Sequence, residues 1–148
     1  MNMSRIRKFL LLSPEEKKLL IRATWLLWVC RLGLWLVPFK ALRRHLAKAE
    51  RRSASKLKGG TLEIDKIIWA VAVASRYVPA ATCLTQALAG QVLLKQHCAP
   101  ARLRIGVMKN ERGALQAHAW IESQGQVVIG KLPDLAMFTE LPSAGELV

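Results

Sequence analysis

The chain has 148 residues, of which 52% are hydrophobic, so it is long and apolar enough to form one folded core, and a disordered tail is excluded. Its net charge of +13 is uneven, because residues 1–60 hold 15 Lys and Arg against three acids, whereas residues 61–148 hold eight against seven. A nucleic-acid binder usually spreads its positive charge over the face that meets phosphate, so we expect no nucleic-acid partner.

The first strong element is a long apolar helix. Ser13-Pro14-Glu15-Glu16 is a typical helix start, because its serine caps, its proline suits the first turn and its second glutamate completes a capping box. The apolar run 19–39 is about long enough to span a bilayer, but Arg22 and Arg31 interrupt it on opposite sides of the helix. We therefore expect no stable membrane span, but a helix that the rest of the domain covers, with its arginines at the rim.

A second, basic helix is predicted over residues 40–52, after the break at Pro38. The small and polar residues 53–60 then read as a linker, and the charge imbalance ends there. We therefore divide the chain into a basic helical N-terminal region, residues 1–58, and a core, residues 59–148.

The core is predicted to contain two helices followed by a hairpin sheet. Residues 61–77 have helical periodicity, and a further helix begins at Cys83, capped by Thr82, and runs to residue 96. Beyond Pro100 the apolar residues alternate, which predicts strands over residues 102–107, 115–122 and 126–130. Helices followed by antiparallel strands are typical of an α+β fold.

Cys83 is the best candidate for a nucleophile. At the first turn of a helix, unpaired N–H groups and the helix dipole stabilise a thiolate, and the same N–H groups can stabilise an oxyanion. The alternative is that Cys83 is a small buried apolar residue. The three cysteines form no close pair and no C-x-x-C motif, which favours a reduced, cytoplasmic setting without disulfides or a zinc clamp. We expect no metal and no other cofactor, and Cys30 and Cys98 are expected to be inert.

His118 is the candidate base. It lies mid-strand between two alanines, which leave room for a helix to pack on the sheet, and Trp120 follows on the same face. A purely structural histidine is the alternative. A third group must orient the imidazole, and Asp134, just after the last strand, is preferred because Glu122 lies roughly 13 Å along the strand.

The order of these residues resembles the transglutaminase-like superfamily and, more closely, the leader peptidases of bacterial lasso-peptide biosynthesis. The matching segments are Cys83-Leu84 with Ala87-Leu88-Ala89 behind it, residues 101–107, and His118-Ala119-Trp120-Ile121-Glu122 through to Gly125. The spacing of 35 residues between Cys83 and His118 and the basic, leucine-rich N-terminal half also suit that family.

This resemblance implies a compact transglutaminase-like (papain-like) core, in which a nucleophile-bearing helix packs on a small antiparallel sheet. It implies a cytoplasmic cysteine protease that uses Cys83, His118 and Asp134 to remove the leader from a ribosomally made precursor peptide. The resemblance also implies an asparagine-synthetase-like cyclase that receives the processed peptide. A separate leader-recognition protein is implied as well, because residues 1–60 are predicted to form helices rather than a leader-binding winged helix. Two alternatives stay open: a transglutaminase-like acyltransferase with the same thiol, and a non-catalytic basic module that binds an acidic partner or a membrane surface.

Overall fold

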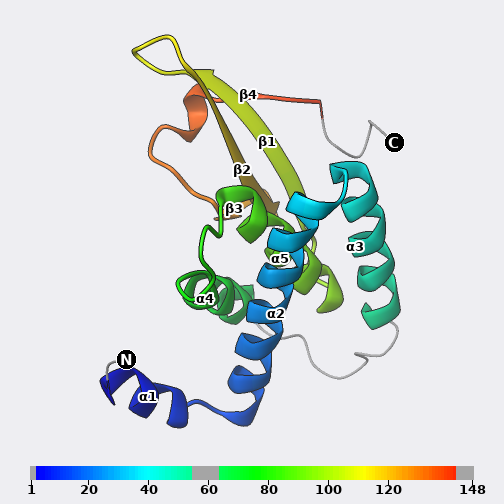
Figure 1. Cartoon of the computed structure of the whole chain (residues 1–148), viewed down its shortest axis with the longest axis vertical. Helices are drawn as coiled ribbons and strands as arrows, with labels where there is room; N and C mark the ends of the chain where they lie inside the picture. The colour runs from blue at the N-terminus through cyan, green and yellow to red at the C-terminus, as the bar shows by residue number, and fades with distance from the viewer. Residues whose placement is uncertain (1–2, 55–63, 143–148) are drawn as a thin grey trace.

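A computed structural model describes residues 3–54 and 64–142 (Figure 1). The helices of these residues are α1 Met3–Leu10, α2 Pro14–Leu36, α3 Phe39–Ala54, α4 Ile64–Ser75 and α5 Cys83–Gln96, with a 3-10 turn at Leu135–Met137. The strands are β1 Arg102–Lys109, β2 Leu115–Ser123, β3 Gln126–Ile129 and β4 Thr139–Glu140. The α+β class predicted from the sequence is confirmed.

The predicted capping box starts α2. The Ser13 hydroxyl accepts a hydrogen bond from the Glu16 amide at 3.2 Å, and the Glu16 carboxylate accepts one from the Ser13 amide at 2.9 Å. Hydrogen bonding to its carboxylate, first from the Ser13 amide and then from the Ser13 side chain, lowers the pKa of Glu16. The helix ends where Val37 becomes extended before Pro38, so the sequence placed both ends of α2 to within a residue.

One hydrophobic core joins the helices to the sheet. In Figure 1, α2 lies in front of α5, and α3 runs beside them. Leu26 and Cys30 of α2 and Leu42 of α3 are buried in the same cluster as Leu93 of α5 and Ile121 of β2. The boundary of the predicted two-part division, between residues 58 and 59, and most of the predicted linker lie outside the described residues, and the division stays a prediction.

The domain covers only one face of α2. Leu19, Ala23, Leu26, Leu27 and Cys30 are buried, whereas the opposite face, with three tryptophans, is exposed. The expectation of a covered helix therefore holds for half of its circumference. By length and composition α2 is also the one helix of the described residues that could cross a membrane, although core helices of soluble proteins pass the same test.

The sheet is antiparallel, with the strand order β3-β2-β1-β4. β1 and β2 form a long hairpin in which Gly106 pairs with His118 and Ile105 with Ala119. β3 pairs only with the last part of β2, from Ile121 to Ser123. The edge of β2 beside His118 is therefore not covered by β3.

Candidate active site

Cys83 is the first residue of α5, as predicted. The Thr82 hydroxyl caps the helix by accepting a hydrogen bond from the Thr85 amide at 3.4 Å, and it lies 3.1 Å from the Thr85 hydroxyl. The first amides of a helix have no intrahelical acceptor, so those of Cys83 and Leu84 are available to an oxyanion or a thiolate. Cys83 is half-buried and packs against the edge of the core.

A tight turn delivers the chain to this helix start. The Ala81 amide donates to the Val78 carbonyl at 3.2 Å, and Pro79 occupies the second position of the turn. Ala80 takes the left-handed conformation, with φ 55°, which costs an L-residue roughly 1–2 kcal/mol. Strained backbone of this kind clusters at functional sites, and here it lies three residues before the candidate nucleophile.

The other two cysteines differ from Cys83 in position and exposure. Cys30 is fully buried in α2, and burial raises the pKa of its thiol to about 12, so it stays protonated at neutral pH. Cys98 is exposed just after the end of α5, where the helix dipole opposes a thiolate. Of the three cysteines, all within the described residues, Cys83 alone combines a helix start with partial exposure.

His118 lies on β2, and its imidazole has a backbone partner. The side-chain Nε2 lies 2.7 Å from the carbonyl oxygen of Gly130. A carbonyl only accepts hydrogen bonds, so Nε2 carries the proton in this contact. Nδ1 is then the nitrogen that is left to accept a proton from a thiol, as a general base must.

Aromatic rings hold the imidazole of His118 in place. The ring of Trp120 is stacked at a centroid distance of 6.2 Å and an interplanar angle of 17°, and the ring of Phe138 lies 5.7 Å away. Gly106 makes room for this cluster, because a Cβ there would lie 2.9 Å from Trp120 and 3.0 Å from Phe138. The buried Trp120 thus shields the imidazole on one side.

Gly130 is a site residue that the sequence did not single out. It has a φ of +81°, and a Cβ there would lie 2.7 Å from the carbonyl of Ala119 and 3.0 Å from Trp120. Only glycine takes this conformation in this space, and it aims the carbonyl at His118. The available signal was a glycine at the end of the last predicted strand, but a backbone acceptor has no side-chain signature.

Asp134, the predicted third member, lies in the exposed turn before the 3-10 helix. Among the contacts of the described residues, no hydrogen bond joins its carboxylate to His118, and the Gly130 carbonyl holds the Nε2 position instead. Glu122 is engaged elsewhere, since it accepts from Arg104 at 3.2 Å and from the Trp120 indole at 3.4 Å. The role of Asp134 stays a prediction.

The fold brings the two elements of the candidate pair together, because α5 packs on β2. Ala119 and Ile121 point into the core that α5 shares, and strand alternation places His118 on the opposite face, at the uncovered edge of β2. Within the described part of the chain, no hydrogen bond joins the Cys83 thiol to His118. The Cys83 thiol and the His118 imidazole thus start from opposite faces of β2, and direct contact between them would have to be made around this edge. Catalytic hydrogen bonds often form fully only when substrate is bound.

A comparison with protein-family models identifies the family of the chain. Residues 24–143 match the model of the transglutaminase-like superfamily, from within α2 to beyond β4. The chain belongs to the transglutaminase-like superfamily. Its members are often cysteine peptidases or acyltransferases, so this transglutaminase-like chain has a fold in which a thiol nucleophile is common. No curated protein and no solved structure matches the chain.

The described residues gather no group of three or more His, Cys, Asp and Glu side chains that would hold a metal ion. His97, next to Cys98, is buried, and neither of its ring nitrogens has a hydrogen-bond partner. Burial and the nearby Arg22 lower the pKa of His97, so it is held neutral. This histidine lies at the end of α5 opposite to Cys83 and takes no part in the candidate site.

Proposed function

We propose that this chain is a cysteine peptidase that removes the leader from a ribosomally synthesised lasso-peptide precursor. Membership of the transglutaminase-like superfamily supports a thiol enzyme, and the segments around Cys83 and His118 support the narrower assignment by their resemblance to lasso leader peptidases. The single observation that carries the proposal is the Nε2 contact of His118 with Gly130, which leaves Nδ1 as a base at the edge of β2, the strand whose other face packs against the helix of Cys83.

The proposed reaction has two steps. His118 Nδ1 takes the thiol proton, and the Cys83 sulfur attacks the carbonyl carbon of the leader–core amide, with the resulting oxyanion stabilised by the free amides at the start of α5. His118 then gives the proton to the departing nitrogen of the core peptide, which leaves the leader as a thioester on Cys83. In the second step His118 deprotonates water, the water attacks the thioester, and the thiol and a leader carboxylate are released.

The proposal includes partners and a place in the cell. A separate leader-recognition protein would deliver the precursor, and an asparagine-synthetase-like cyclase would receive the released core peptide, both in the cytoplasm. The excess of positive charge in residues 1–60 supports docking of an acidic partner or leader, since opposite charge accelerates encounter.

The test is cleavage of a precursor peptide in a reconstituted reaction with the leader-recognition protein, followed by mass spectrometry. Cys83→Ala and His118→Ala are each expected to abolish cleavage, whereas Cys98→Ala, which removes a more exposed thiol, is expected to leave it unchanged. Cleavage that persists in the Cys83→Ala protein would contradict the proposal.

The same acyl-enzyme also serves acyl transfer, which the superfamily includes. Product mass separates the two activities, because hydrolysis adds water across the bond and transfer adds the attacking amine. A product that carries an added amine, and no free leader carboxylate, would assign the chain to the acyltransferases. A chain that binds its partner equally well with and without Cys83, and cleaves nothing, would be a binding module.

A further inference from the structure

α2 presents an apolar stripe that nothing in the described residues covers. The stripe consists of Ile21, Trp25, Trp28, Leu32, Trp35 and Leu36, all exposed, with Trp35 at 79% and Trp25 at 64%. At 100° per residue these side chains lie within about 100° of arc, so they form one face. Three of the five tryptophans of the chain lie on this face. Exposure of so many large apolar side chains on one helix marks an interaction surface rather than scattered surface residues.

Positive charge borders this stripe at the start of α2. Lys17 and Lys18 lie on the same side of the helix, one turn before Ile21. α1 adds the exposed Arg7 and Lys8 and is tied to this end, because the Lys17 ammonium donates to the Leu10 carbonyl at 3.1 Å. The exposed side chains Ile6, Phe9 and Leu10 of α1, and Leu11 just after it, extend the apolar surface there.

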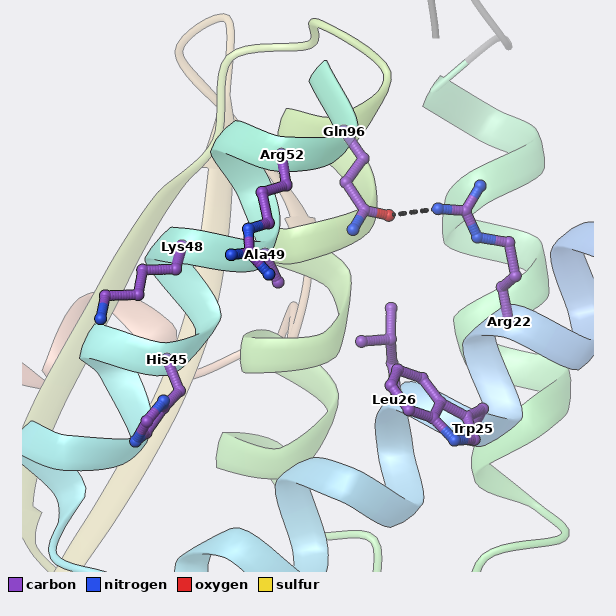
Figure 2. A pocket seen from close by; sticks show the side chains of 8 residues that line it. All are labelled: Arg22, Trp25, Leu26, His45, Lys48, Ala49, Arg52 and Gln96. Carbon is purple, nitrogen blue, oxygen red and sulfur yellow. Dashed lines mark hydrogen bonds between the residues drawn. The ribbon is translucent and has the colours of Figure 1, made fainter. Parts of the chain in front are cut away.

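A basic groove formed by α2, α3 and α5 runs along one side of the stripe. The groove has a volume of about 580 Å³. Figure 2 shows the side chains that line it: Arg22, Trp25 and Leu26 of α2, His45, Lys48, Ala49 and Arg52 of α3, and Gln96 of α5. Trp25 belongs both to the groove and to the stripe. The ionised side chains that line the groove are all cationic. The Arg22 guanidinium is held in place because it donates a 2.8 Å hydrogen bond to the side-chain oxygen of the buried Gln96. The groove thus offers a fixed cation beside an apolar face, which suits an anionic group at the end of an apolar molecule.

We propose that this surface binds an anionic lipid bilayer, with the stripe inserted at the boundary between headgroups and acyl chains and the groove occupied by lipid phosphate. Tryptophan at the centre and Lys and Arg at the border are the composition of helices that lie in the plane of a membrane surface. The charge of residues 1–60, 15 basic against three acidic residues, complements anionic lipid rather than a neutral surface. The surface binds membrane without spanning it, because the opposite face of α2 is buried in the core.

The test is co-sedimentation of the full-length chain with vesicles of phosphatidylcholine alone and of phosphatidylcholine with about 30% phosphatidylglycerol. Binding to the anionic vesicles and a blue shift of tryptophan fluorescence are expected, with little binding to the neutral ones. A stripe variant, Trp25→Ser with Leu32→Ser and Trp35→Ser, is expected to bind at least about tenfold more weakly. Its matched control is Trp69→Ser with Tyr77→Ser and Leu115→Ser, which removes exposed apolar side chains from other parts of the chain.

A second pair of variants tests the groove independently of the stripe. Arg22→Gln with Lys48→Gln is expected to weaken binding to anionic vesicles by about tenfold, whereas Lys109→Gln with Arg112→Gln, at the tip of the hairpin, removes the same charge and is expected to have little effect. Equal losses in the two charge variants, equal losses in the stripe variant and its control, or no binding to anionic vesicles would each overturn the proposal.

Two further outcomes would replace the lipid by another occupant. Sedimentation velocity without lipid is expected to show a monomer, and a dimer that the stripe variant dissociates would put a second copy on this face and overturn the proposal. Washing the vesicles with alkaline carbonate is expected to release the chain, and retention after the wash would indicate a membrane span and overturn the surface mode. Circular dichroism of each variant establishes that the fold is intact.

Discussion

The Gly130→Ala substitution tests whether the backbone at the end of β3 holds the candidate base. The residue has a φ of +81°, where an L-residue costs roughly 1–2 kcal/mol. The new Cβ would also lie 2.7 Å from the Ala119 carbonyl and 3.0 Å from the Trp120 Cβ, and overpacking of this kind costs about 1–3 kcal/mol. The alanine restricts the unfolded chain, which offsets about 0.4–1 kcal/mol. We expect a net loss of about 2–4 kcal/mol in the free energy of unfolding.

Gly113→Ala is the matched control for the backbone part of this cost. Gly113 has a φ of +75°, close to that of Gly130, but a Cβ there would meet nothing within 4 Å. We expect this variant to lose only about 1 kcal/mol. Urea unfolding followed by circular dichroism measures both variants, and the difference between them is the cost of the contact with β2. Equal losses in the two variants would refute the reasoning from the close approach of Gly130.

The same substitution is expected to disturb the imidazole. Since the Gly130 carbonyl accepts from Nε2 of His118 at 2.7 Å, moving it removes the reason for that proton to stay on Nε2. Two-bond ¹H–¹⁵N correlation spectra are expected to show a largely Nε2-protonated His118 in the wild-type chain and a mixture of tautomers in Gly130→Ala. An unchanged tautomer ratio would mean that another group orients the ring.

Three further predictions concern the helix cap, the hairpin and a buried histidine. Thr82→Ala is expected to cost about 1 kcal/mol of stability in urea unfolding and to slow alkylation of Cys83, because the cap of α5 is lost; an unchanged midpoint would contradict the cap. Gln124, with φ 52°, precedes Gly125 in a two-residue hairpin loop, so Gln124→Asn is expected to raise the thermal midpoint, and a fall would contradict the assigned turn. The lowered pKa of His97 means that the unfolded chain takes up a proton near pH 6.5 while the folded chain does not, so stability should fall as the pH drops below 6.5 towards the lowered pKa. His97→Leu should flatten this dependence in urea titrations, and a slope that survives in the variant would assign it to another group.

The sequence located elements well where local chemistry decides the boundaries. The bounds of α5 agree with the structure, since Thr82 caps one end and Pro100 prevents extension beyond the other. The start of α2 follows from its capping box, and the hairpin strands follow from their alternation. β4 was missed because its two residues carry no periodicity and depend on pairing with Gly106 and Val107 of a distant strand.

Tertiary contacts determine which group orients His118 and how much of α2 is buried, and neither could be predicted from the sequence. The sequence offered Asp134 as the group that orients His118, but it could not foretell that the chain turns at Gly130 and directs a carbonyl there. The apolar composition of α2 predicted a helix that the domain covers with only its arginines at the rim, whereas the domain has partners for one face and leaves Trp25 and Trp35 exposed. Composition reports how apolar a helix is, and only the number of packed neighbours determines how much of it is covered.

The most direct test of the Cys83–His118 pair is the rate of alkylation of each cysteine by iodoacetamide, measured by peptide mass spectrometry in the wild-type chain and in His118→Gln. Cys98 is an internal reference, because it is more exposed than Cys83, and the buried Cys30 is expected to stay unmodified. If His118 takes the proton of Cys83, this half-buried thiol should react faster than Cys98, and the substitution should abolish the advantage. Rates that follow exposure alone, with Cys98 fastest and Cys83 unaffected by His118→Gln, would contradict the pair.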